Sequence, residues 1–176
     1  MPMLRSRNPV FPDTNVLVAY VIGQDDPTRV VCLAFDKAKE RDVILVTNQV
    51  MAELYSAGMS EKKIPTEEIT RALRRLGPRL VYVGAPSPED LKSVYIEDPD
   101  DMPILYSART AGAKVILTRD NKWFLDNVYG IDGEIMDPHG YLYHDEILAG
   151  KKTFSKPYFG RIKRVFSDRR RGGKDE

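Results

Sequence analysis

Short aliphatic and β-branched runs alternate along the chain with longer segments of helical periodicity, and this alternation limits the possible folds more than any other feature. The runs cover residues 8–11, 43–48, 79–84 and 114–118, with a weaker fifth run at 133–137. Apolar residues at three- and four-residue spacings predict helices over 28–41, 49–59, 66–76 and 101–111. Strands that alternate with helices are typical of an α/β fold with a mainly parallel sheet.

Two helix starts carry capping signals. Ser87, Pro88 and Asp90 combine an N-cap, a proline in the first turn and a capping carboxylate, so we expect a helix to begin at Ser87. Asp101 is expected to cap the helix over 101–111, where Pro103 lies in the first turn and its missing N–H costs nothing.

The net charge of +1 conceals two segments of opposite sign. Residues 151–176 hold 10 basic and 3 acidic side chains, a local charge of +7, which leaves −6 for residues 1–150. The length of 176 residues suits one domain with an appendage. We therefore predict a domain over 1–150 and a basic C-terminal extension over 151–176, with a short amphipathic helix at 161–170 and a disordered end.

Several classes of protein are excluded by the sequence. The longest apolar run, residues 16–22, has seven residues, far short of the roughly 18 needed to span a bilayer. The N-terminus lacks the apolar region of a secretory signal, so we expect a cytoplasmic protein. Cys32 stands alone, which excludes an intramolecular disulfide and a cysteine metal cluster, and it fits a small core residue.

Four carboxylates follow strands or begin helices. Asp13 follows the first run and Asp120 the run that ends at Thr118, while Glu53 and Asp101 lie near the starts of predicted helices. Ligands of open parallel sheets bind beyond the carboxyl ends of the strands, so these acids are candidates for one cleft. Clustered acids raise one another's pKa, and a hard cation such as Mg²⁺ relieves that repulsion. The plainer interpretation is that each acid is only a cap or a turn residue.

Three longer stretches carry these acids in order: FPDTNVLVAY, NQVMAELYSAGM and DPDDMPILYSARTAGAKVILTRD. Together they resemble the PIN-domain family over roughly residues 8–140. The resemblance implies a three-layer α/β/α sandwich around a mainly parallel sheet. It also implies a ribonuclease that depends on one or two Mg²⁺ or Mn²⁺ ions.

The catalytic and metal-binding acids of the family match Asp13, Glu53, Asp101 and Asp120. Asn15 and Thr118 match the polar companions that hold the first and last acids by hydrogen bonds.

The third acid is ambiguous because Asp98, Asp100 and Asp101 crowd together. The distance to the small-residue turn at 112–113 selects Asp101, with Asp100 as the second choice and a supporting neighbour of the site.

The resemblance implies an endoribonuclease that hydrolyses single-stranded RNA. VapC-type toxins of this family are covered by an antitoxin and often form homodimers. A housekeeping RNA-processing nuclease and a non-catalytic RNA- or partner-binding PIN module stay open. Phosphatase chemistry of the haloacid-dehalogenase type needs an aspartate where Asn15 stands. His139 and His144 share no helical face and are expected to lie in a loop without a role in chemistry.

The C-terminal extension interleaves basic and aromatic residues, as single-strand binders do. The candidate RNA-binding residues are Lys156, Tyr158, Arg161, Lys163, Arg164, Arg169 and Arg170. Alternatively, Phe159, Ile162, Val165 and Phe166 dock the extension on the acidic domain.

Overall fold

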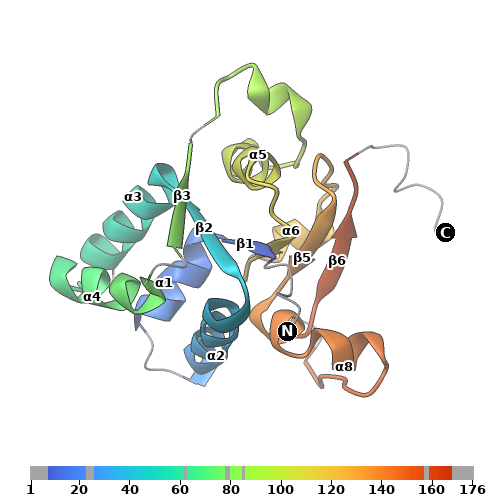
Figure 1. Cartoon of the computed structure of the whole chain (residues 1–176), viewed down its shortest axis with the longest axis horizontal. Coiled ribbons are helices and arrows are strands. Elements are labelled where there is room, and N and C mark those ends of the chain that lie inside the picture. Colours follow the sequence, from blue (N-terminus) through green and yellow to red (C-terminus); the bar gives the residue numbers. More distant parts are fainter. Residues whose placement is uncertain are drawn as a thin grey trace, which may run out of the picture.

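The computed structural model describes residues 8–22, 26–61, 63–77, 80–84, 86–156 and 159–167. These residues form one sheet with the strand order β3-β2-β1-β4-β5-β6 (Figure 1). The strands are β1 (Pro9–Pro12), β2 (Val43–Thr47), β3 (Leu80–Val83), β4 (Val115–Leu117), β5 (Gly133–Met136) and β6 (Ile162–Val165). The longer helices are α1 (Thr14–Ile22), α2 (Asp26–Arg41), α3 (Asn48–Ser56), α4 (Thr66–Leu76) and α5 (Met102–Thr110). The short ones are α6 (Lys122–Leu125), α7 (Pro138–Leu142) and α8 (His144–Leu148).

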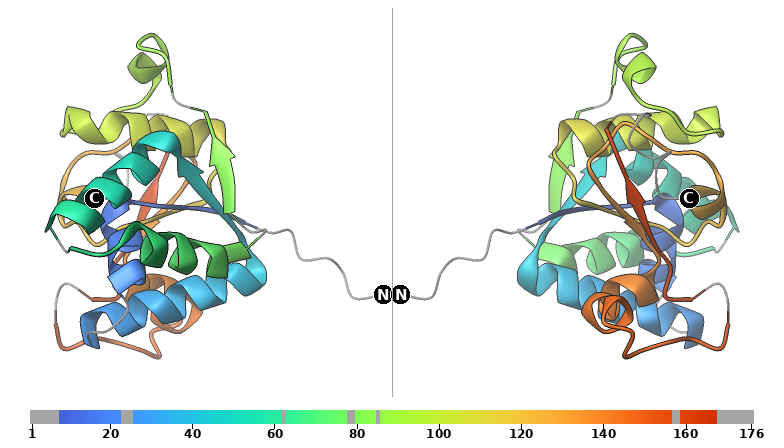
Figure 2. Two further views of the ribbon diagram at one scale, coloured as in Figure 1. Left: turned by 90° about the vertical axis from the view of Figure 1, so that its left-hand side faces the viewer. Right: turned by 90° about the vertical axis from the view of Figure 1, so that its right-hand side faces the viewer.

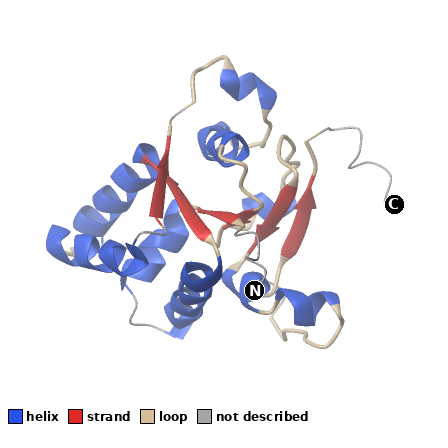
Figure 3. Cartoon of the chain, viewed as in Figure 1, coloured by secondary structure: helices blue, strands red, loops and turns tan. Residues whose placement is uncertain are grey.

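The sheet is parallel from β1 to β5, and β6 pairs antiparallel with β5. Helix α5 covers one face and α2 the opposite face (Figures 1 and 2), which makes a three-layer α/β/α sandwich. Figure 3 shows the helices outside the central strands. The five strands, the predicted helices other than those from Ser87 and at 161–170, and the predicted fold class are confirmed. The chain adds β2 and β3 on one side of β1 and then returns to add β4 on the other side, so the strand order, not the strand direction, reverses between β1 and β4.

The core lies on both faces of the central strands. Phe11 of β1 and Ile116 of β4 are fully buried. On α2, Val31, Ala34, Phe35 and Ala38 form the apolar stripe that the spacing predicts, and each is at most 1% exposed. Burial of a side chain the size of valine or phenylalanine contributes about 1.5–3 kcal/mol. This packing holds β1 and β4 rigidly side by side.

The predicted helix over 161–170 is wrong. Residues Ile162–Val165 form β6, which pairs with β5 from Gly133 opposite Val165 to Met136 opposite Ile162. Residues 168–170 lie outside the described part of the chain. The spacing of Ile162, Val165 and Phe166 fits a helix locally, but β5 offers an unpaired edge, and hydrogen bonds to that edge decide the conformation. The sheet therefore continues beyond residue 150.

Three local expectations are also corrected. Ser87 and Asp90 interact, since the Ser87 backbone N–H and hydroxyl both donate to the Asp90 carboxylate at 2.9 and 2.7 Å, but the predicted helix from Ser87 is wrong, because only a 3₁₀ turn (Asp90–Ser93) with Glu89 at its N-cap follows. Asp101 does not cap α5, because its backbone is already helical and its side chain makes no cap hydrogen bond. His139 and His144 lie in α7 and α8, not in a loop.

None of the helices in the described ranges has both the length and the apolarity that crossing a bilayer requires.

Candidate active site

Asp13 is the centre of a polar network between β1 and β4. Its backbone N–H extends the parallel ladder by donating to the Leu117 carbonyl at 2.9 Å. Its carboxylate is only 7% exposed and accepts hydrogen bonds from three groups. These donors are the Thr14 N–H at 2.6 Å, the Asn15 side-chain amide at 2.7 Å and the Thr118 hydroxyl at 2.9 Å. The carboxylate is therefore fixed in one orientation beyond the carboxyl ends of β1 and β4, where the strand order reverses. Open parallel sheets usually bind their ligands at this position.

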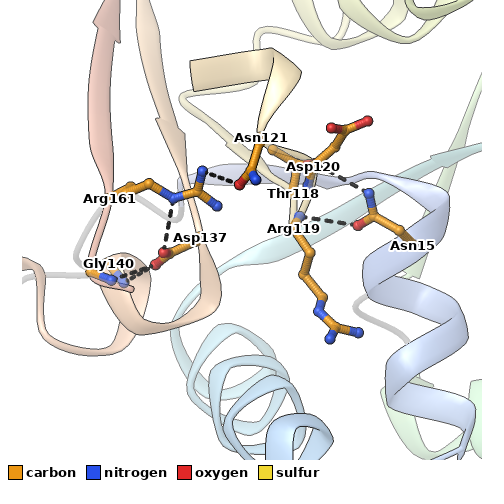
Figure 4. Close-up of polar contacts among 9 residues, drawn as sticks. Asn15, Thr118, Arg119, Asp120, Asn121, Asp137, Gly140 and Arg161 are labelled. Atoms are coloured by element: carbon orange, nitrogen blue, oxygen red, sulfur yellow. Dashed lines mark hydrogen bonds and ion pairs between the residues drawn. The ribbon is translucent and has the colours of Figure 1, made fainter. Parts of the chain in front are cut away.

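Thr118 and Asn15 connect the two central strands beyond their carboxyl ends. The fully buried Thr118 hydroxyl also accepts from the Asp120 N–H at 3.0 Å, so one side chain holds Asp13 and positions Asp120. The side-chain oxygen of Asn15 accepts from the Arg119 N–H at 3.1 Å (Figure 4). The structure thus places both predicted companions in direct contact with Asp13.

Glu53 reaches the same edge from α3, which starts directly after β2. The N-cap of α3 is Thr47, whose hydroxyl accepts from the Val50 N–H at 3.2 Å. One carboxylate oxygen of Glu53 accepts from the Thr14 hydroxyl at 2.6 Å, and the other from the Gln49 amide at 3.1 Å. Glu53 is exposed, and Thr14 links it to Asp13.

The acids of this edge repel one another. The pKa of Asp13 is raised to about 6, chiefly by burial and to a smaller extent by the charges of Asp120 and Glu53, while the hydrogen bonds from Thr118 and Thr14 lower it. Burial also raises the pKa of Asp101 to about 7, with contributions from Asp13, Asp98 and Asp120. Charge repulsion therefore couples four acids, which we call the carboxylate cluster: Asp13, Glu53, Asp101 and Asp120. Full ionisation of the cluster therefore costs stability unless a cation binds to it.

The three neighbouring aspartates before α5 differ in their surroundings. Asp98 is paired with Lys122 at 2.8 Å and accepts the Asp100 N–H at 3.1 Å, and hydrogen bonds from these two groups lower its pKa. Asp100 is exposed. Asp98 and Asp101 are both partly buried, but of the three only Asp101 has a raised pKa, caused by burial and then by the charges of Asp13, Asp98 and Asp120.

The carboxylate cluster offers the oxygen ligands of a hard-cation site, but its side chains are too far apart to coordinate one ion together. Carboxylate oxygens are the ligands that Mg²⁺ and Mn²⁺ prefer. In the described ranges, no three acids, histidines or cysteines are close enough together to hold a metal ion. An ion bound here would have to draw the side chains together.

The candidate RNA-binding residues of the C-terminal extension have different environments. Arg161 pairs with Asp137 at 3.5 Å, donates to the Asn121 side chain at 2.6 Å and lies 3.9 Å above the Phe124 ring. Lys163 donates to the carbonyls of Trp123 and Asp126.

Lys156 and Arg164 are exposed, whereas Tyr158, Arg169 and Arg170 lie outside the described residues. Contacts between the extension and the domain are therefore observed at Arg161 and Lys163.

The sequence analysis missed three polar residues. Thr14 bridges Asp13 and Glu53 by hydrogen bonds. Arg119 lies between Thr118 and Asp120 in the sequence, and its side chain extends away from Asp120 (Figure 4). Asp137 follows β5 and is 2% exposed, so the rule that selected Asp13 could have found it. Its carboxylate accepts the N–H of Gly140 at 2.6 Å and of Gly160 at 3.1 Å. A Cβ at Gly140 would collide with the Arg161 carbonyl, so this turn requires glycine.

The family model of the PIN domain matches residues 9–122, well over half of the chain, and the chain therefore belongs to the PIN domain family. Among solved structures, the chain is similar to that of VapBC2 from Rickettsia felis bound to a DNA fragment from their promoter. The identity is 20% and the TM-score 0.46, over 66% of this chain and 92% of that chain. Comparison with curated proteins gives no match.

Proposed function

We propose that the protein is a metal-dependent endoribonuclease that hydrolyses phosphodiester bonds of single-stranded RNA at the carboxylate cluster. Nuclease activity is general in the PIN domain family, to which the chain belongs. The observation that carries the proposal is the buried carboxylate of Asp13 between the ends of β1 and β4, with Asp120 and Glu53 close enough to raise its pKa and with the pKa of Asp101 raised by the charges of Asp13 and Asp120 as well as by burial. Such an arrangement costs stability unless a cation binds, so it favours a binding site over a set of caps.

Asp13, Asp101 and Asp120 would hold Mg²⁺ or Mn²⁺, with Glu53 on a second ion or on water. Bound there, such an ion lowers the pKa of a coordinated water and neutralises charge on the phosphodiester. The hydrogen bonds from Thr14, Asn15 and Thr118 fix the Asp13 carboxylate before an ion arrives. That preorganisation reduces the cost of binding.

The test replaces Asp13 by Asn and measures cleavage of a labelled single-stranded RNA in Mg²⁺ and in Mn²⁺. We expect activity to fall about a hundred- to a thousandfold, the size of effect seen when a catalytic electrostatic contact is lost. The far-ultraviolet circular dichroism spectrum and the melting temperature provide the folding control. Unchanged cleavage by a folded D13N variant would refute the assignment.

The motif resemblance to VapC-type toxins extends the proposal to an antitoxin partner and a homodimer. An RNA-processing nuclease with a housekeeping role is the alternative. Inhibition of growth on expression, relieved by the product of an adjacent reading frame, distinguishes them. A wild-type protein that binds RNA but does not cut it in Mn²⁺ would instead be a non-catalytic PIN module.

A further inference from the structure

A concave site opens beside the carboxylate cluster, at the carboxyl ends of β4 and β5. It has a volume of about 160 Å³ and is lined by Arg119, Asn121, Asp137, His139, Phe159 and Arg161, with α2 contributing Val30 and Val31. We propose that this pocket binds a nucleotide of the RNA strand next to the cleaved phosphodiester, with Arg119 on its phosphate. The inference rests on the proposed function, because it specifies how that site holds its substrate. We call this site the nucleotide pocket.

Arg119 supplies an uncommitted cation. Its side chain is exposed and extends away from Asp120 (Figure 4). Its backbone N–H donates to Asn15, and Asn15 donates to Asp13 at 2.7 Å, so the Arg119 backbone is held two hydrogen bonds from Asp13. Within the described residues, no hydrogen bond or ion pair engages its guanidinium group. A guanidinium in this state suits bidentate contact with a phosphate.

Arg161 forms the fixed wall of the nucleotide pocket. Asp137, Asn121 and the Phe124 ring hold its guanidinium from three sides (Figure 4 shows the first two). Two arginines against one aspartate leave the lining with a charge of +1. The neighbouring carboxylate cluster repels a polyanion, so a cationic pocket beside it is what brings the strand within reach.

His139 and Phe159 add an aromatic surface to the same pocket. Their rings are stacked with centroids 4.2 Å apart and an interplanar angle of 19°. Burial lowers the pKa of His139, so the imidazole is neutral near pH 7, and Phe159 remains 38% exposed. Exposed aromatic rings beside cations are the surfaces on which proteins stack unpaired bases. The phosphate and base contacts together select a single-stranded nucleotide.

The experiment compares two variants, Arg119→Gln and the control Arg71→Gln. Arg71 is an exposed residue of α4, and this helix lies across the molecule from β5 (Figure 1). Binding of a labelled single-stranded RNA is measured by fluorescence anisotropy in EDTA at several salt concentrations. R119Q should weaken binding about tenfold, as loss of one charge-assisted contact does. It should also reduce the slope of log Kd against log salt by about 0.7. R119K should keep the slope, and R71Q should match the wild type.

A Phe159→Ala variant tests the base contact, since it should weaken binding without changing the salt slope. Equal affinities and slopes for R119Q and R71Q would overturn the proposal, as would the absence of RNA binding by the wild type. Weakened binding by R119Q in a protein that does not cut RNA supports the nucleotide pocket while refuting the nuclease. Cleavage by the wild type with unchanged R119Q binding does the opposite.

Discussion

Asp13 and Asp137 occupy equivalent positions in the sheet and have opposite surroundings. Each follows a parallel strand at its carboxyl end, each is nearly buried, at 7% and 2% exposure, and each accepts hydrogen bonds from backbone amides. The donors to Asp137 include the cationic Arg161, which forms an ion pair with it. The neighbours of Asp13 are acids, and Asp120 and Glu53 raise its pKa further.

Position in the fold alone therefore does not separate Asp137, which is paired with Arg161, from Asp13, to which we assign a catalytic role in our proposal. Asp137 is compensated inside the protein, because a buried acid paired with a cation needs no ligand. Asp13 is oriented by neutral donors and has no cation among its hydrogen-bond partners in the described residues, so its ionised form is left for an external cation to stabilise under our proposal. Both acids are buried, and the charge of their partners is what distinguishes them.

The largest expected effect on stability comes from Asp137→Asn. This change leaves the mostly buried Arg161 without its carboxylate, and we expect a loss of about 2 kcal/mol in the free energy of unfolding, or about 4–8 °C in Tm. Asp13→Asn at pH 8 without metal should keep Tm within about 3 °C, because a lost hydrogen bond is offset by relieved repulsion. Calorimetry of both variants measures this. An equal fall in Tm for D137N and D13N would contradict the proposed difference between the two acids.

A smaller effect is expected from Asp101→Asn, and it depends on pH. The folded-state pKa is raised to about 7 from an ordinary 3.8, so the folded protein binds this proton more tightly than the unfolded chain. The stabilisation from this group is complete below about pH 4 and is lost as the pH rises through 7. D101N should therefore be more stable than the wild type at pH 8 in EDTA, by about 1–2 kcal/mol once solvent screening of this half-exposed group is included.

The difference between D101N and the wild type should vanish near pH 4. Urea unfolding at both pH values measures it, and Asp100→Asn is the matched control because Asp100 is exposed one residue away. The same gain in both variants would show that Asp101 has no special coupling to the cluster.

Local patterns predicted the strands of this fold well, because their aliphatic runs lie in a parallel sheet buried on both faces. They failed at β6, where the apolar spacing fits a helix and only the distant edge of β5 makes the segment a strand. They failed again at Asp101, because the 3₁₀ turn Pro99–Asp101 starts the helical backbone early and leaves the carboxylate without a cap contact. The first error arises where a tertiary contact overrides local preference, and the second where a neighbouring 3₁₀ turn moves the start of the helical backbone.

The part of the candidate site that follows from the family motif was predictable. Asp13, Asn15 and Thr118 meet as the resemblance implies, since adjacent parallel strands bring their ends together. The position of Asp137 after β5 was predictable, but its pairing with Arg161 was not, because that contact joins residues distant in the sequence. The guanidinium group of Arg119 has no hydrogen-bond or ion-pair partner in the described ranges, while Arg161, predicted to bind RNA, is held by Asp137 and Asn121.

Titration of the purified protein with Mn²⁺ at pH 8, followed by calorimetry, tests the central claim most directly. The wild type and D137N, measured below its melting temperature, should bind one or two ions with the same affinity, because Asp137 already has an internal cation. D13N should lose that binding. Equal Mn²⁺ binding by the wild type and D13N would contradict the account, since the uncompensated charge of Asp13 would then have no role in holding a cation.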